Sequence, residues 1–115
     1  MSTDFGIDAA RLDDGTHVVT ATGDIDTQSA PQLSASLDRI MASGGRHVVI
    51  DLSGVRFIDS SGLVALVTGS NRLRKAAGDL RIAAPSEPVL RLLNLTRMDA
   101  VFGIFPTREA ALGSV

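Results

Sequence analysis

The strongest pattern in the chain is an apolar run that leads into a segment with helical periodicity. Residues 48–50 are all β-branched, without a polar interruption, which predicts a strand buried on both faces. A second apolar run follows at 55–58, and after it apolar residues recur at the 3.6-residue spacing of an amphipathic helix. These positions are Leu63, Leu66, Val67, Leu73, Ala76 and Ala77. The helix is predicted to begin within 59–62, DSSG, and to end at Gly78, placed as the glycine that follows a last turn.

The same patterns predict two strands and one helix before this central unit. Residues 5–10 place Phe5, Ile7 and Ala9 on one face of a short strand, and residues 17–22 are rich in Val and Thr, as a second strand would be. The dipeptide Asp-Gly at 14–15 is typical of a type I′ hairpin turn, in which both central residues have positive φ. Ser29 and Gln32 have the spacing of a capping box at the start of a helix. The apolar positions of that helix are Leu33, Leu37, Ile40 and Met41.

The remainder of the chain alternates between strands and helices. The predicted elements are a strand at 80–83, a helix from 89, a strand at 101–105 and a helix at 108–112 capped by Thr107. Alternation after an initial hairpin indicates parallel strands joined by right-handed crossovers. The predicted fold class is therefore α/β: one domain over residues 1–115, with a short, mostly parallel sheet, an initial β-hairpin and about four helices.

Composition narrows the classes of function. The chain has 115 residues, 44% of them hydrophobic, a net charge of −2 and no cysteine. The charge gives no reason to expect nucleic acid or an anionic membrane as a partner, and no apolar run reaches the roughly 18 to 20 residues of a membrane span. The N-terminal residues carry acids and no basic segment, unlike a secretory signal. We expect a soluble, cytoplasmic protein without disulfides or zinc-thiolate sites.

The predicted topology brings acids and hydroxyls together at one edge of the sheet. If the strands ending near residues 22 and 52 are parallel, the loops that follow them lie at the same edge. This places Asp24 and Asp26 beside Asp59, Ser60 and Ser61. No other part of the chain concentrates reactive groups in this way.

The residues at this edge do not match a known catalytic arrangement. A serine nucleophile needs a base, and the two histidines, His17 and His47, are at strand starts, at the opposite end of the sheet. The chain has neither a nucleophile elbow nor a glycine-rich phosphate loop. The three aspartates could hold a divalent ion, but their spacing matches no known loop. These observations argue against an enzyme.

Helix capping is the simplest reading of the residues 59–61. Aspartate and serine are both preferred N-cap residues. Gly62 is harder to explain in this way, because glycine inside a helix costs about 1 kcal/mol relative to alanine. It indicates a close approach to the backbone, either by a neighbouring loop or by a partner.

Three motifs resemble those of the STAS-domain anti-sigma-factor antagonists, the bacterial sporulation and stress-response family. The segment 23–26, GDID, resembles the family's G-E-[LI]-D segment after the second strand. The segments 49–52, VIDL, and 57–63, FIDSSGL, resemble its central strand and D-S-[ST]-G-L signature. The segments 80–82, LRI, and 89–93, VLRLL, resemble the next strand and the helix after it. The resemblance extends over nearly the whole chain.

The resemblance implies a partner switch regulated by phosphorylation. In the family, the unphosphorylated antagonist binds an anti-sigma factor, itself a serine kinase, and the sigma factor is released. The kinase modifies the serine that matches Ser60, and a PP2C-type phosphatase reverses the modification. Ser61 is the second candidate for the phosphorylation site in this chain. ATP belongs to the kinase, so no cofactor is expected in this chain. The partner-binding residues implied are Asp24, Asp26, Asp59, Ser60, Ser61, Gly62 and Leu63.

Two other functions stay open. The chain could be a STAS accessory subunit of a transporter or of a stressosome-like assembly, in which Ser60 is only a helix cap. It could also be a small nucleotide-binding or hydrolytic protein, although it lacks a phosphate loop. A pull-down that identifies a kinase-like anti-sigma factor would favour an antagonist over an accessory subunit. A nucleotide titration tests whether the chain is a nucleotide-binding protein.

Overall fold

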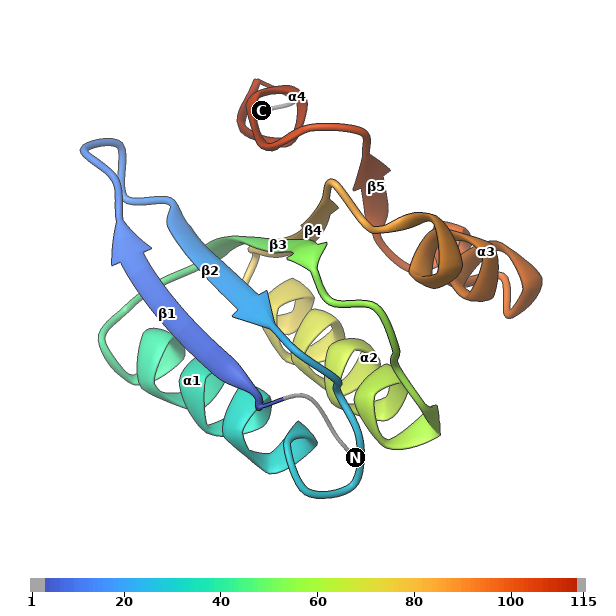
Figure 1. Cartoon of the computed structure of the whole chain (residues 1–115). Coiled ribbons are helices and arrows are strands. Elements are labelled where there is room, and N and C mark those ends of the chain that lie inside the picture. Colours follow the sequence, from blue (N-terminus) through green and yellow to red (C-terminus); the bar gives the residue numbers. More distant parts are fainter. Residues whose placement is uncertain (1–3, 114–115) are drawn as a thin grey trace.

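The sheet has the predicted mixed topology (Figure 1). A computed structural model describes residues 4–113. The N-terminal segment that was compared with a secretory signal begins outside these residues. Within the described residues the strand order is β1-β2-β3-β4-β5, with β1 antiparallel to β2 and the other neighbours parallel. The strands are β1 Gly6–Arg11, β2 His17–Thr22, β3 His47–Gly54, β4 Asp79–Ala83 and β5 Gly103–Phe105.

Helices cover both faces of this sheet unequally (Figure 1). They are α1 Ala30–Ala42, α2 Ser60–Lys75, α3 Glu87–Leu95 and α4 Arg108–Leu112, with a short 3₁₀ helix, η1, at Met98–Ala100. Residues of α1, α2 and α3 share the main hydrophobic core, whereas α4 packs through Ala111 on a smaller cluster with Val18, Val49 and Ala83. The predicted fold class, including the initial hairpin and four helices, is confirmed. No helix within residues 4–113 is long and apolar enough to cross a membrane.

The central strand β3 is buried on both faces, as its sequence predicts. Val48 and Ile50 belong to the main core, and Val49 between them belongs to the cluster under α4. All three side chains are at most 1% exposed. Successive strand residues point to opposite faces, so only a run of apolar residues fits a strand with helices on both sides.

The turn type predicted for the hairpin is wrong. The hairpin does not contain a type I′ turn, because Gly15 has positive φ, at 90°, and Asp14 does not. The Gly15 amide bonds to the Leu12 carbonyl at 3.0 Å, and the Leu12 amide bonds to the Thr16 carbonyl at 2.8 Å. This is the geometry of a three-residue loop, in which a type I turn is followed by a left-handed glycine.

Gly78 has a different role from the one predicted. Ala77 takes the left-handed conformation after α2, with a φ of 64°. A Cβ atom on Gly78 would lie 1.9 Å from the carbonyl oxygen of Arg46, so a glycine is required there by the neighbouring backbone.

The last strand is also shorter than predicted, since η1 and its following turn occupy the residues before Gly103. Thr107 caps α4 as predicted, accepting from the Ala110 amide at 3.0 Å.

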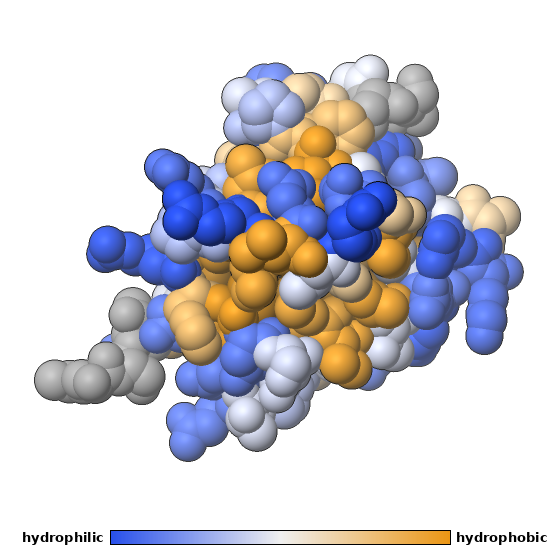
Figure 2. All heavy atoms as spheres, turned by 90° about the vertical axis from the view of Figure 1, so that its right-hand side faces the viewer, coloured by the Kyte–Doolittle hydropathy of each residue, from blue (hydrophilic) through white to orange (hydrophobic). Residues whose placement is uncertain are grey.

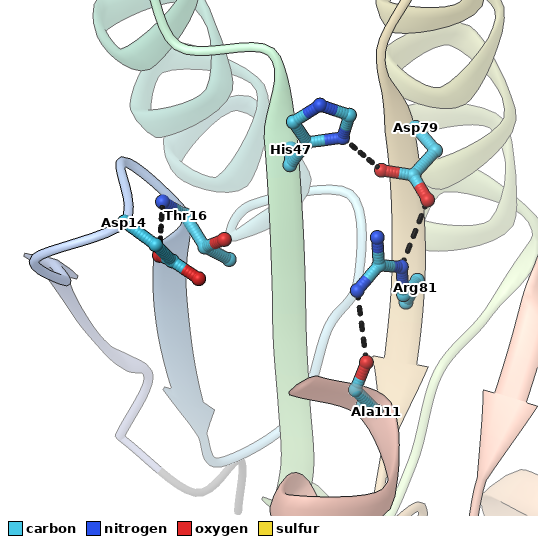
Figure 3. A network of polar contacts seen from close by, with 6 residues as sticks. All are labelled: Asp14, Thr16, His47, Asp79, Arg81 and Ala111. Atoms are coloured by element: carbon cyan, nitrogen blue, oxygen red, sulfur yellow. Dashed lines mark hydrogen bonds and ion pairs between the residues drawn. The ribbon is translucent and has the colours of Figure 1, made fainter. Parts of the chain in front are cut away.

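Polar contacts fasten α4 to its face of the sheet (Figure 3). Arg81 on β4 is 6% exposed; its Nη1 donates to the Ala111 carbonyl at 2.9 Å, and its Nε donates to Asp79 Oδ2 at 2.8 Å. Asp79 Oδ1 lies 2.8 Å from His47 Nδ1 on the adjacent strand. The buried guanidinium therefore has partners on both the strand and the helix, as a buried charge needs.

Asp51 on β3 forms the other attachment of α4. Its Oδ2 accepts from Arg108 Nη2 at 2.8 Å, and its Oδ1 accepts from the Ser53 amide at 2.8 Å. Burial acts to raise the pKa of Asp51, but the Ser53 contacts and the Arg108 guanidinium together outweigh it, so the pKa is lowered.

We expect the fold to lose stability as the pH falls below about 4, the ordinary range of aspartate. A carboxylate with a lower pKa in the folded state stabilises the fold above its unfolded-state pKa, and this contribution disappears as the pH falls through the folded-state value. Urea denaturation between about pH 6 and pH 3 measures the effect. The free energy of unfolding should fall less steeply in Asp51→Asn. Equal slopes in the two proteins would assign the effect to other carboxylates.

Candidate functional site

The loops that follow β2 and β3 are joined by backbone hydrogen bonds at the carboxyl edge of the sheet. The Ile25 amide donates to the Phe57 carbonyl at 2.9 Å, and the Asp59 amide donates to the Ile25 carbonyl at 3.0 Å. Ile25 and Ile58 form an isolated parallel bridge. Both isoleucines are at most 2% exposed, so the acids on either side of them are held by buried anchors.

The predicted edge of acids and hydroxyls is therefore present. We call Asp24, Asp26, Asp59, Ser60 and Ser61 the rim. The parallel pairing brings the first two of these residues to the same edge as the other three. Because the rim lies at the carboxyl ends of parallel strands, it occupies the position at which open α/β sheets usually meet their ligands.

Asp26 organises the first half of the rim. Its Oδ1 accepts from the amides of Gln28 at 3.0 Å and Ser29 at 3.1 Å. The Ser29 hydroxyl accepts from the Asp26 amide at 2.8 Å and donates to the Asp24 carbonyl at 2.7 Å. The hydrogen bond from the Ser29 amide, with smaller contributions from the neighbouring donors, lowers the pKa of Asp26.

The capping box predicted for Ser29 and Gln32 is wrong. Ser29 has α-helical backbone angles and makes no side-chain cap on α1. Its hydroxyl is used by the preceding loop, where Asp26 provides the turn that leads into the helix. Asp26 is a stronger acceptor than a serine hydroxyl for amides at the start of a helix, and it lies three residues earlier.

Asp59 caps α2. Its Oδ1 accepts from the Ser61 amide at 2.9 Å and from the Gly62 amide at 3.3 Å. Aspartate is among the preferred N-cap residues, and its charge complements the positive end of the helix dipole. The capping role predicted for this segment therefore belongs to Asp59, and the following serines do not have to perform it.

The two serines have different surroundings. Ser61 is half-buried, and its Oγ lies 3.4 Å from Oγ1 of Thr27 in the loop after β2. Ser60 is exposed and lines a groove of about 270 Å³ together with Leu63, Val64 and Met98. Ser60 is thus accessible to another protein, whereas Ser61 contacts the neighbouring loop.

Apolar side chains are exposed on this side of the molecule. Figure 2 shows them gathered in the middle of the side on which α3 lies, with hydrophilic side chains around them. Among the exposed large apolar residues of the described chain are Phe57 at 50%, Val64 at 64% and Leu95 at 75%, and Val64 lines the groove with Ser60. An exposed apolar area of this kind commonly marks a protein-binding surface. Hydrophobic periodicity does not reveal this surface, because Val64 lies off the periodic apolar face of the helix.

The close approach at Gly62 is made by the protein's own loops. A Cβ atom on Gly62 would lie 2.5 Å from Ile58 Cγ1 and 2.6 Å from Ile25 Cγ2. Gly62 itself is buried. Of the two explanations open at the sequence level, the structure therefore supports approach by a neighbouring loop. Leu63, next to it, is half-buried and lines the groove with Ser60.

The N-terminal segment adds residues to the rim that sequence reasoning missed. Asp4 and Phe5 line a groove of about 440 Å³ together with Asp24 and Asp26. Gly23 permits this arrangement, since a Cβ atom there would lie 2.3 Å from the Asp4 carbonyl oxygen. The glycine also has a positive φ of 85°. No motif in the sequence connects residues so far apart.

Both histidines are distant from the rim, since they start β2 and β3. His47 starts β3 and contacts Asp79, at the opposite end of the sheet, as predicted. Within residues 4–113 no group of three or more histidine or acidic side chains is arranged to hold a metal ion. The rim thus offers acids, two hydroxyls of which that of Ser60 is the more exposed, and an apolar groove, a combination suited to recognition by another protein.

Comparisons with known proteins confirm the resemblance seen in the motifs. The STAS domain family model matches residues 9–111. The anti-sigma-F factor antagonist RsfB of Mycobacterium tuberculosis is 30% identical over 101 residues, covering 88% of this chain and 82% of that protein. The anti-sigma-B factor antagonist of Bacillus subtilis is 31% identical over 94 residues, covering 82% and 85%. The crystal structure of an anti-sigma factor antagonist from Mycobacterium paratuberculosis has a TM-score of 0.88 and 32% identity, with 97% and 94% covered. The chain belongs to the STAS domain family, and these three relatives are anti-sigma-factor antagonists by name.

Proposed function

We propose that this chain is an anti-sigma-factor antagonist regulated at Ser60. The unphosphorylated chain binds an anti-sigma factor that is also a serine kinase, and the sigma factor is thereby released. Phosphorylation of Ser60 ends the binding, and a PP2C-type phosphatase restores it. The chain itself is not an enzyme, and it acts in the cytoplasm, where sigma factors direct transcription.

The exposure of Ser60 beside an apolar groove is the observation that carries this proposal. A kinase that reaches the Ser60 hydroxyl covers the groove lined by Leu63, Val64 and Met98. Burial of these side chains would supply hydrophobic binding energy, about 25 cal/mol per Å² of apolar surface. The same residue therefore lies within the docking surface and is accessible for modification.

The charges at the rim account for a switch that leaves the fold intact. A phosphoserine adds about −1.5 to −2 charge. At the N-terminus of a helix this charge is favourable by roughly 0.3–1 kcal/mol, and Ser60 is the first residue of α2. Binding to a partner becomes less favourable, because the partner surface that fits a neutral hydroxyl beside Asp59 must then accommodate the added charge. Modification would change recognition more than stability.

Ser60→Ala should abolish phosphorylation by the cognate anti-sigma factor and leave binding within a few-fold. The alanine removes the acceptor of the phosphoryl group, and a neutral hydroxyl contributes only about 1 kcal/mol. Incubation with the kinase and radiolabelled ATP, followed by phosphosite mapping, measures incorporation, and calorimetry measures affinity.

Ser61→Ala is the matched control for this experiment, since Ser61 is adjacent but turned toward Thr27. It should incorporate phosphate at the wild-type rate. Incorporation that persists in Ser60→Ala and disappears in Ser61→Ala would move the site by one residue. A pull-down from the native cells that recovers only transport or stressosome-type proteins would instead favour the accessory-subunit function.

A further inference from the structure

A change of register in β3 lies between the core of the sheet and the rim. Thr20 pairs with Asp51, whereas Thr22 pairs with Gly54. β3 therefore has one residue more than β2 over this stretch, which is a β-bulge. Bulges bend a strand and re-aim the residues that follow. The chain leaves this bulge toward Asp59 and Ser60.

The Asp51 carboxylate satisfies the backbone at the bulge. Its Oδ1 accepts from the Ser53 amide at 2.8 Å. An amide at a bulge lacks its usual ladder partner, and here a side chain from the same strand replaces that partner. Asp51 is 7% exposed and Ser53 is exposed, so this contact is partly buried.

Arg108, the first residue of α4, holds the Asp51 carboxylate in place. Its Nη2 and Nε donate to Asp51 Oδ2 at 2.8 and 3.2 Å, and Nη2 also donates to Thr20 Oγ1 at 3.0 Å. One guanidinium thus contacts both strands at the last pair before the register changes. The second oxygen of Asp51 remains directed at the Ser53 amide.

Backbone hydrogen bonds continue from the bulge to the rim. The Gly23 amide donates to the Gly54 carbonyl at 3.0 Å, and the bonds of Ile25 with Phe57 and Asp59 follow. The bulge therefore fixes where the segment leading to Ser60 begins, and the two loops are tied together along their length.

We propose that Arg108 is a positioning residue for the phosphorylation of Ser60. It acts through Asp51 and the β3 bulge, from the face of the sheet opposite to α2. The proposal rests on the function proposed for Ser60. It makes α4 a site from which the presentation of Ser60 can be altered without touching the rim. Replacing Arg108 would weaken the hydrogen bond from the Ser53 amide to Asp51 and displace the first turn of α2.

The test compares Arg108→Gln with Thr107→Ala in the isolated chain of residues 1–115 by amide NMR and hydrogen exchange. Thr107→Ala is the matched control, because it removes the cap of α4 and leaves Arg108 and Asp51 in place. In Arg108→Gln we expect exchange of the Ser53 amide to accelerate roughly tenfold, as for loss of a charge-assisted contact. The amide signals of residues 59–62 should shift in Arg108→Gln and not in Thr107→Ala.

Phosphorylation by the cognate kinase gives the functional readout. The maximal rate at Ser60 should fall roughly tenfold in Arg108→Gln, since small misplacements of a reacting group are costly. Arg108→Lys keeps the charge and one donor group, so its rate should lie between those of Arg108→Gln and the wild type. It replaces Arg108→Gln in the test if that variant does not fold. Rim signals and rates that match those of Thr107→Ala would overturn the proposal. A wild-type protein without phosphate on Ser60 would overturn the proposed function, whereas the amide signals test the link to the bulge independently.

Discussion

Phosphorylation of Ser60 should weaken binding of the anti-sigma factor by roughly 30- to 150-fold, with little change in the melting temperature of the free protein. Two like charges about 4 Å apart repel by about 1 kcal/mol in water and about 4 kcal/mol at an effective dielectric constant of 20. A half-buried interface lies between these limits, at about 2–3 kcal/mol, which converts to the stated change in Kd. Calorimetric titration of the phosphorylated and unmodified proteins measures the affinity, and thermal denaturation measures the stability.

Two controls separate repulsion from unfolding. Ser60→Asp should have a smaller effect than phosphate, because it brings one charge on a shorter side chain. Added salt should restore only part of the affinity, since close pairs are screened less than exposed ones. Equal affinity of the two forms would contradict a charge switch at the rim. A large drop in the melting temperature on phosphorylation would show that the switch operates by unfolding.

The hydrophobic pattern predicted those features that depend on periodicity alone. The continuous run at 48–50 implied a strand with helices on both sides, and β3 is that strand. Parallel topology then implied that the loops after β2 and β3 meet, which the Ile25–Ile58 bridge confirms. These inferences succeed because they require only the order and type of the elements.

Contacts between distant residues could not be predicted in this way. Arg108 and Asp51 are far apart in sequence, and their pairing requires α4 to lie on a particular face of the sheet. Ser60 and Ser61 are chemically the same, and only the orientation of the first turn of α2 distinguishes the exposed hydroxyl from the one near Thr27. Neighbouring helical residues point about 100° apart, so a small error in phase exchanges their roles.

Local motifs failed where two residues competed for the same function. Ser29 has a good capping sequence, but its hydroxyl is used by the preceding loop, where the Asp26 carboxylate accepts from the amides of Gln28 and Ser29 just before α1. Gly78 has a good position for ending a helix, but Ala77 adopts the required conformation. In each case the motif identified a helix end correctly and assigned the wrong residue to it.

Gly62→Ala should destabilise the fold by about 1–2 kcal/mol, a drop of roughly 5–10 °C in the melting temperature. Alanine is favoured over glycine in a helix by about 1 kcal/mol, but the new Cβ would lie 2.5 Å from Ile58 Cγ1 and 2.6 Å from Ile25 Cγ2. Both atoms lie near the backbone in buried side chains, so relief of the overlap requires movement of the two loops that carry the rim. Urea and thermal denaturation measure the loss.

Gly69→Ala is the matched control, because it makes the same substitution on the same helix. There the new Cβ would meet Leu37 Cδ1 at 2.6 Å, the terminal methyl of a flexible side chain that can rotate away, so the gain in helix propensity should largely offset the overlap. We expect its stability to stay within about 0.5 kcal/mol of wild type. Because Ile25 and Ile58 anchor the acids of the rim, Gly62→Ala should also weaken partner binding at temperatures where the mutant is folded, whereas Gly69→Ala should bind normally. If the two alanine variants proved equally stable, the packing explanation would be wrong, and a selective loss of binding in Gly62→Ala would then assign the glycine to direct contact with the partner.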